Sequence, residues 1–339
     1  MGYATLWLIG FGVLFTGYLM TAGFDYGVGV LLPFVTKGDT QRRLGLNAVG
    51  PFLLGNEVWL IVALGMLIGT LPGFESRLLD GAYPPAVIAV LGAILTIVSV
   101  LLRSRSPNTS LRGFFDALIF LGGLFASFGW GAVTTMFAAG VDLGPDGRVV
   151  DTAGALGAFP VLGGLTMVAL MGSYGAAFLI GRTGHGPIAV RAGRIGRLLG
   201  LIAALLLVLT VLVGALGHSL TGSLVRPSVT VVLVALALLA IGSAQLLSRR
   251  HRPWPAFWAT GVAIGLLPLA VFVGKFPQLI TSRSPGAPLL PASELADSST
   301  SLAMITWFAG PILLIVIAVQ VWSWYAFGGR LTRDSAMFF

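Results

Sequence analysis

Three acidic residues, Asp25, Glu57 and Asp116, lie in or beside long apolar stretches of the chain. A carboxylate within a membrane is costly and by default marks a proton path, an ion path or a buried partner. The macrodipole favours acids in a first helical turn, which fits Asp116 well and Glu57 in part. Asp25 is expected near a helix C-terminus, where the dipole disfavours it. We therefore expect a functional or pairing role above all for Asp25, and a structural role remains open for the other two.

The chain has few residues that could bind a metal ion or a haem iron. The chain has no cysteine, which excludes disulfides and thiolate sites. Of its three histidines, His185 and His251 are expected in loops. His218 is expected at an outer helix end, where it is either a haem ligand together with a methionine or a hydrogen-bonded interface residue. We expect no metal site, no pair of membrane histidines and no stand-alone enzyme.

The elements that position these residues are membrane helices. Hydrophobic residues make up 56% of the 339 positions and charged residues only 9%, with a mean hydropathy of +0.95, which excludes an ordinary water-soluble enzyme. A membrane helix needs about 20 apolar residues to cross ~30 Å of hydrocarbon. The sequence therefore predicts an all-α polytopic protein with nine spans. The runs are Met1–Phe24, Val58–Phe74 (reaching back towards Gly50), Gly81–Leu102, Ala117–Val141, Thr152–Gly181, Leu198–Val225, Pro227–Ser248, Pro253–Gly274 and Ser298–Gly329.

The charges alternate between the two sides of the predicted bundle. Fifteen of the twenty lysines and arginines follow odd-numbered spans, whereas most acids follow even-numbered ones. This positive-inside pattern places the N-terminus outside and the C-terminus in the cytoplasm. It also explains the net charge of +8 without a nucleic-acid partner. We expect the three acids to form one cluster in the cytoplasmic third, and Trp254 and Trp324 to belong to an aromatic belt.

A weak internal repeat suggests a duplication. The pair Tyr26-Gly27 recurs 148 positions later as Tyr174-Gly175, and Arg43 is matched by Arg191 at the same offset. We expect one integral membrane domain, residues 1–339, with two parallel four-helix halves, 1–141 and 152–274, and a final helix at 302–328.

One ordered set of residues resembles subunit II of the cytochrome bd-type quinol oxidases over essentially the whole chain. Its most specific part lies in the first sixty residues, and Phe115-Asp116, Phe276-Pro277 and Thr306-Trp307 continue it downstream. The specific residues are Gly23, Asp25, Gly27, Gly29, Arg43, Asn47, Gly55, Asn56, Glu57 and Trp59.

The resemblance implies a bacterial cytoplasmic-membrane complex that oxidises quinol and reduces dioxygen to water. In this family the partner, subunit I, carries haem b and haem d, and some complexes have a small accessory subunit. Subunit II supports the partner, helps protons to reach the haem site from the cytoplasm and in some members holds a quinone. By position, Asp25, Glu57 and Asp116 are the proton-path candidates, and the glycines, Arg43, Asn47, Asn56 and Trp59 form the structural motif.

Two departures from the family pattern bear on proton transfer. The family usually has an acid where Ala22 stands, and Trp-Asp where Leu53-Leu54 stands. Because leucine carries no proton, Glu57, water or the partner must supply the route, or this is a divergent branch. Two alternatives stay open: a relative that assembles without oxidase turnover, and an ion- or proton-coupled secondary transporter with buried acids.

Overall fold

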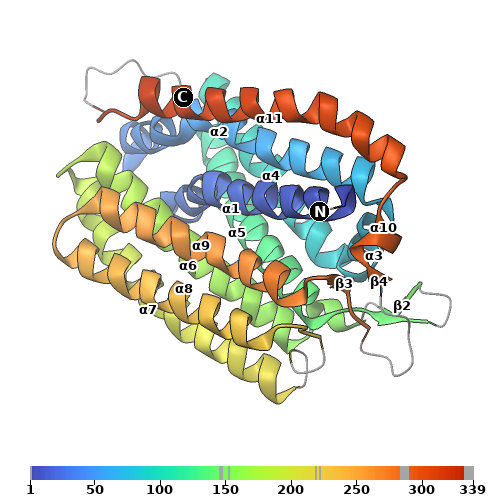
Figure 1. Ribbon diagram of the computed structural model, residues 1–339. Coiled ribbons are helices and arrows are strands. Elements are labelled where there is room, and N and C mark those ends of the chain that lie inside the picture. The colour runs from blue at the N-terminus through green and yellow to red at the C-terminus, as the bar shows by residue number, and fades with distance from the viewer. Residues whose placement is uncertain are drawn as a thin grey trace.

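The computed structural model describes residues 2–144, 148–151, 153–217, 220, 223–282 and 290–331 (Figure 1). Within these residues, nine helices are long and apolar enough to cross a membrane, which confirms the predicted all-α fold. These helices are α1 (Tyr3–Val35), α2 (Gly38–Thr70), α4 (Tyr83–Arg105), α5 (Thr109–Ala139), α6 (Ala158–Thr183), α7 (Pro187–Leu216), α8 (Pro227–Arg249), α9 (Pro253–Lys275) and α11 (Ser299–Phe327).

Short elements connect the long helices at one end of the bundle, on the right in Figure 1. The strands pair antiparallel, β1 with β2 and β3 with β4. The short elements are α3 (Pro72–Gly81), β1 (Asp142–Leu143), β2 (Val149–Asp151), the 3-10 helix η1 (Ala153–Leu156), β3 (Gln278–Ile280), β4 (Leu290–Pro291) and α10 (Ala292–Leu295).

The first two long helices extend well beyond the expected apolar runs. Helix α1 continues to Val35, so Asp25 lies about three turns before its end. Helix α2 already begins at Gly38, which places Glu57 near its middle, and Asp116 lies about two turns into α5. The expectation of first-turn acids is therefore wrong for both residues. Each of these three acids lies within a helix and is paired with a side chain of a neighbouring helix.

Helix α1 lies at the centre of the bundle and packs on α2, α5, α6 and α9. Glycines permit the closest approaches, because small residues let membrane helices come into backbone contact. A Cβ atom at Gly27 would collide with the carbonyl group of Met171 on α6. On the opposite side, a Cβ at Gly123 of α5 would lie 2.6 Å from the carbonyl oxygen of Tyr26. Gly27 also packs against Gly175, its counterpart in the internal repeat.

The segments rich in cations meet at one end of the bundle. Arg191 Nε donates to the carbonyl oxygen of Val35 at 2.7 Å, and Arg182 donates to that of Gly329. At the other end, the amide of Asp297 donates to the carbonyl oxygen of Thr70 at 3.1 Å. The connections therefore alternate between two ends, as the charge pattern requires.

Two tryptophans of the expected aromatic belt lie near helix ends and also pack against interior rings. The ring of Trp324 lies 4.9 Å from that of Phe52 and 5.8 Å from that of Phe24, centroid to centroid. Trp254 packs 6.1 Å from Trp324. Both rings fill space between helices, because α11 lies against α2 and turns Trp324 inwards.

Candidate functional site

A chain of hydrogen bonds links α5, α1 and α2 in the interior. Trp130 Nε1 donates to the Tyr18 hydroxyl at 3.0 Å, and the hydroxyls of Tyr18 and Tyr26 are 2.5 Å apart. Tyr26 in turn donates to Glu57 Oε1 at 2.5 Å. Tyr18 and Tyr26 are eight residues apart, which brings both onto one helical face. Because the single hydroxyl proton of Tyr26 is donated to Glu57, the Tyr18 hydroxyl donates to Tyr26, and the chain points at the Glu57 carboxylate.

A second set of hydrogen bonds starts one residue away on both helices. Asn56 Nδ2 donates to Asp25 Oδ2 at 2.7 Å, and Gln320 Nε2 of α11 donates to Asn56 Oδ1 at 2.9 Å. Trp59 Nε1 donates to Gln320 Oε1 at 3.3 Å. Asp25 is only 2% exposed, and its buried Oδ1 has no hydrogen-bond partner among the described residues.

We call these residues together the interior polar cluster: Tyr18, Asp25, Tyr26, Asn56, Glu57, Trp59, Trp130 and Gln320. In the described part of the chain, neither Asp25 nor Glu57 forms a salt bridge. The two carboxyl groups are therefore held by neutral donors alone. A buried acid without a cationic partner is expensive to keep ionised, and such acids are suited to taking up and releasing protons.

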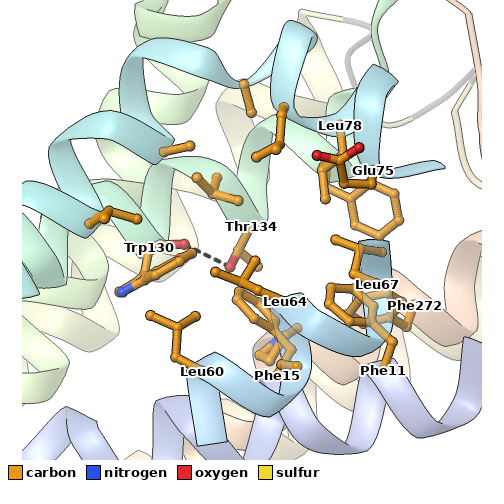
Figure 2. Close-up of a pocket in the computed structure, with 18 of the residues that line it drawn as sticks. Phe11, Phe15, Leu60, Leu64, Leu67, Glu75, Leu78, Trp130, Thr134 and Phe272 are labelled. Atoms are coloured by element: carbon orange, nitrogen blue, oxygen red, sulfur yellow. Dashed lines mark hydrogen bonds between the residues drawn. The ribbon is translucent and has the colours of Figure 1, made fainter. Parts of the chain in front are cut away.

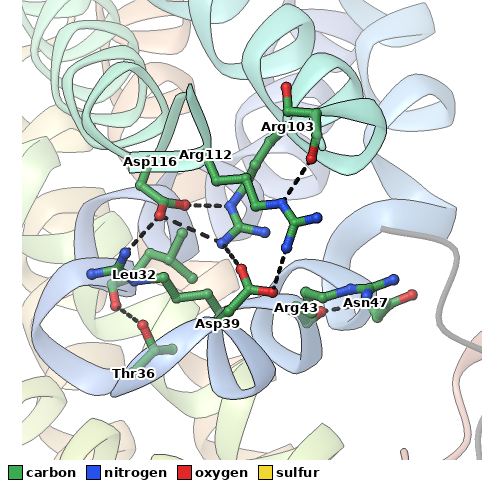
Figure 3. A network of polar contacts seen from close by, with 10 residues as sticks. Leu32, Thr36, Asp39, Arg43, Asn47, Arg103, Arg112 and Asp116 are labelled. Atoms are coloured by element: carbon green, nitrogen blue, oxygen red, sulfur yellow. Dashed lines mark hydrogen bonds and ion pairs between the residues drawn. The ribbon is translucent and has the colours of Figure 1, made fainter. Parts of the chain in front are cut away.

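Asp116 belongs to a different cluster, the arginine network, formed by Asp39, Arg42, Arg103, Arg112 and Asp116 (Figure 3). Arg103 Nε contacts Asp116 Oδ1 at 2.5 Å and its Nη2 contacts Asp39 Oδ1 at 2.8 Å. Arg42 reaches Asp116 Oδ2 at 2.7 Å, and Arg112 reaches Asp39 Oδ2 at 3.0 Å. The Arg103 side chain is only 2% exposed. The network joins the start of α2 to the facing ends of α4 and α5.

The structure thus divides the three predicted acids. Asp25 and Glu57 share the interior polar cluster, whereas Asp116 is bound by two arginines, so the expectation of a single cluster is wrong. Sequence reasoning missed Asp39 and Arg103 because both were assigned to loops. It also missed Tyr18 and Trp130, whose only signal is a polar ring edge in an apolar run.

The remaining residues of the motif lie in different surroundings. A Cβ at Gly23 would lie 3.5 Å from Met171 Cε, an ordinary contact, whereas a Cβ at Gly29 would lie 3.0 Å from the carbonyl oxygen of Ile119. Arg43 offers its carbonyl oxygen to Asn47 Nδ2 at 2.8 Å. Gly55 faces open space among the described residues.

The two positions that depart from the family pattern lie in different environments. Ala22 is fully buried, whereas Leu54 is 58% exposed on the outer face of α2. Glu57 follows Leu54 by about one turn and is only 7% exposed. The acid of this chain therefore faces the bundle interior, and the leucine faces outwards.

An apolar cavity of about 220 Å³ lies beside the hydrogen-bonded chain (Figure 2). Leu60 and Trp130 border one side of it, and Leu78 and Glu75 lie at the opposite edge. Thr134 Oγ1 donates to the carbonyl oxygen of Trp130 at 2.8 Å, so this hydroxyl is already engaged. The cavity suits an apolar occupant.

The described histidines lie away from both clusters. His185 and His251 are exposed and line a separate cavity at the cation-rich end. His218, the haem-ligand candidate, lies outside the described residues. Across the described ranges, no group of three or more His, Cys, Asp or Glu side chains is arranged to hold a metal ion.

Comparison with known proteins gives a consistent result over nearly the whole chain. The family model described as cytochrome bd terminal oxidase subunit II matches residues 3–327. The cytochrome bd ubiquinol oxidase subunit 2 of Bacillus subtilis (strain 168) is 27% identical over 334 residues, covering 98% of both chains. The cytochrome bd-I ubiquinol oxidase subunit 2 of Escherichia coli (strain K12) is 26% identical, covering 97% of this chain and 95% of that protein.

A solved structure has the same fold. A chain of the bd oxidase from Geobacillus thermodenitrificans superposes with a TM-score of 0.73 at 16% identity, covering 96% of this chain and 98% of that chain.

Proposed function

Because the chain belongs to the cytochrome bd terminal oxidase subunit II family, we propose that it supports subunit I of a quinol-oxidising, dioxygen-reducing complex and conducts protons to it. The family match makes the chain a membrane subunit of an oxidoreductase complex that is not catalytic alone. It does not favour the transporter interpretation. The finer roles below are proposals that rest on the geometry of the interior polar cluster.

The observation that carries the proton role is the directed chain from Trp130 to Glu57. Three hydrogen bonds of 3.0, 2.5 and 2.5 Å connect the indole, two tyrosines and the carboxylate. A hydroxyl that both accepts and donates can pass a proton along such a chain, and carboxyl groups in membranes serve as proton relays. Glu57 is the group that binds the proton, and Tyr26 and Tyr18 hold it in place and extend its reach. Asp25 supplies a second buried carboxyl group through Asn56.

We propose that haem b and haem d reside in subunit I and that this chain carries no haem. Haem iron needs an axial ligand such as histidine. The described histidines, His185 and His251, are exposed at helix ends and do not face the interior polar cluster. The described residues therefore do not fit a haem beside the proton chain.

Any quinone held by this chain fits best with its isoprenoid tail in the apolar cavity. The lining side chains are almost all hydrocarbon, and the Trp130 indole and Thr134 hydroxyl already donate to Tyr18 and to the helix backbone. The cavity therefore matches a tail better than a quinone ring, which needs hydrogen-bond donors.

We propose the orientation with the N-terminus outside and the C-terminus in the cytoplasm. It is supported by the meeting of the cation-rich segments at one end, as Arg191 with Val35 illustrates. We also propose the two parallel halves, 1–141 and 152–274, with 302–328 added. The contact of Gly27 with Gly175 at the crossing of α1 and α6 supports this duplication.

The test is quinol-dependent oxygen uptake by the complex co-expressed with its subunit I. Glu57→Gln keeps the shape of the side chain and removes the proton-binding group. We expect turnover to fall by roughly a hundredfold, the usual contribution of a positioned proton donor, with the haem spectrum unchanged. Asp80→Asn, an exposed acid outside both clusters, should retain normal turnover. Full turnover in assembled Glu57→Gln complex would refute the proton role, and an active subunit I without this chain would refute the supporting role.

A further inference from the structure

A second cavity, of about 320 Å³, opens at the cation-rich end of the bundle. Its walls come from the end of α6, the start of α7, the turn between α8 and α9, and the segment after α11. That last segment is fixed in place, because the Leu331 amide donates to the carbonyl oxygen of Arg182 at 2.9 Å. The cavity is thus a built feature of four converging segments.

The charged groups around this cavity all carry or can carry positive charge. Arg197, Arg252 and Arg330 line it together with His185 and His251, and no acid is among its described lining residues. Arg197 lies on α7 and is half-buried. Such a cluster of cations creates a local positive potential that attracts an anion.

The four helices that form most of the cavity walls, α6 to α9, contain no acid. Between Thr152 and Ser293 the chain contains ten lysines and arginines and not one aspartate or glutamate. Every salt bridge among the described residues involves Asp39 or Asp116, which belong to the arginine network on α2, α4 and α5. Among the described residues no acid pairs with the cations of this cavity, so they are available to an anionic molecule.

The buried lining of the cavity is mostly apolar apart from Ser173, whereas Arg252 and Arg330 are exposed. Ala176, Ala177 and Ala192 are buried, and Ile180 lies beside them. From the cavity, α7 continues with the exposed side chains of Leu198, Leu201 and Leu205 along its outer face. A ligand that matches both parts has an anionic head and a long hydrocarbon tail.

We propose that this cavity binds the phosphate headgroup of an anionic phospholipid, with the acyl chains lying along the outer face of α7. Arginine binds phosphate through paired, charge-assisted N–H donors, and Arg197 and Arg252 approach the cavity from different helices. Basic pockets between membrane helices on the cytoplasmic side are suited to such headgroups. The cations of the cavity lie at or near the ends of membrane helices, where a headgroup layer would be expected.

The test uses the complete complex with subunit I, washed in detergent and reconstituted with defined lipid. The variant Arg197→Gln/Arg252→Gln removes two cations from the cavity. The matched control is Arg194→Gln/Arg249→Gln. It removes two exposed cations, one on α7 and one at the end of α8, and neither residue lines the cavity. Tightly retained phosphatidylglycerol is counted by mass spectrometry, and affinity is measured by the thermal shift on adding phosphatidylglycerol.

We expect the cavity variant to lose retained phosphatidylglycerol and to bind it at least tenfold more weakly than the wild type and the control variant. Phosphatidylcholine should not replace it. Equal retention by the cavity and control variants would overturn the proposal. An equal thermal shift with inorganic phosphate alone would also overturn it, because the site would then bind free phosphate and not a lipid. If the cavity variant fails to assemble, the single variant Arg252→Gln, at an exposed position, is measured in the same way.

Discussion

The interior polar cluster and the arginine network both hold carboxyl groups between helices of the first half of the chain, but the partners of these groups differ in charge. In the arginine network, Asp39 and Asp116 face three guanidinium groups at 2.5 to 3.0 Å. In the interior polar cluster, Asp25 and Glu57 face an amide and a phenol, at 2.7 and 2.5 Å.

The charge of the partners distinguishes an acid that links helices through ion pairs from an acid that can exchange a proton. Both oxygens of Asp116 accept from arginines, so gaining a proton would break charged contacts. No described cation holds Glu57 or Asp25 in its ionised form. The burial of an acid is therefore a poor guide to its role, and the charge of its partners is a better one.

The largest expected effect follows from neutralising the acid in the arginine network. Asp116→Asn leaves Arg103 buried with only Asp39 as a partner, and breaking a buried ion pair costs about 3 kcal/mol. We expect a corresponding fall in the free energy of unfolding of the detergent-solubilised complex, and less assembled complex in the membrane. Asp80→Asn is the control. An unchanged unfolding transition would mean that the network does not fasten the helices.

The next effect concerns the link between the two tyrosines and Glu57. Tyr26→Phe removes one hydroxyl and breaks the chain at its centre, so we expect turnover to fall roughly tenfold, equivalent to about 1.4 kcal/mol in the barrier. Tyr174→Phe is a close control, because its buried hydroxyl donates only to the carbonyl oxygen of Met20, at 3.0 Å. Equal losses in the two variants would show that Tyr26 matters for packing and not for proton transfer.

Sequence alone predicted the nine helices, because lipid requires long apolar runs and charged segments separate them. It also singled out Asp25 and Glu57, because an acid within a long apolar run is costly in a membrane and easily recognised in a sequence. It misplaced the helix ends because each run was cut at a charge, although Asp39 and Arg103 lie inside α2 and α4. The chain from Trp130 to Glu57 could not be predicted, since it depends on how α1, α2 and α5 are rotated against one another.

A smaller effect is expected from introducing an acid at Leu54, where the resemblance to the family leads one to expect an acid. Leu54 points outwards while Glu57 already supplies a buried carboxyl about one turn further on. We expect Leu54→Asp to change turnover per assembled complex by less than roughly twofold, or about 0.4 kcal/mol in the barrier. Oxygen uptake normalised to haem content measures this. A large rise in turnover would show instead that proton uptake is limited by the missing acid.

The smallest effect on stability should come from the same chemical change as the first prediction, made in the interior polar cluster. In Asp25→Asn the amide oxygen can still accept from Asn56, and the amide nitrogen takes the place of an oxygen that already lacks a described partner. The number of unpaired groups stays the same, while the cost of burying a charge disappears. We expect the free energy of unfolding to stay within about 1 kcal/mol of the wild type or to rise. A loss as large as that of Asp116→Asn would show that Asp25 also depends on its charge for packing, and the distinction between the two clusters would fail.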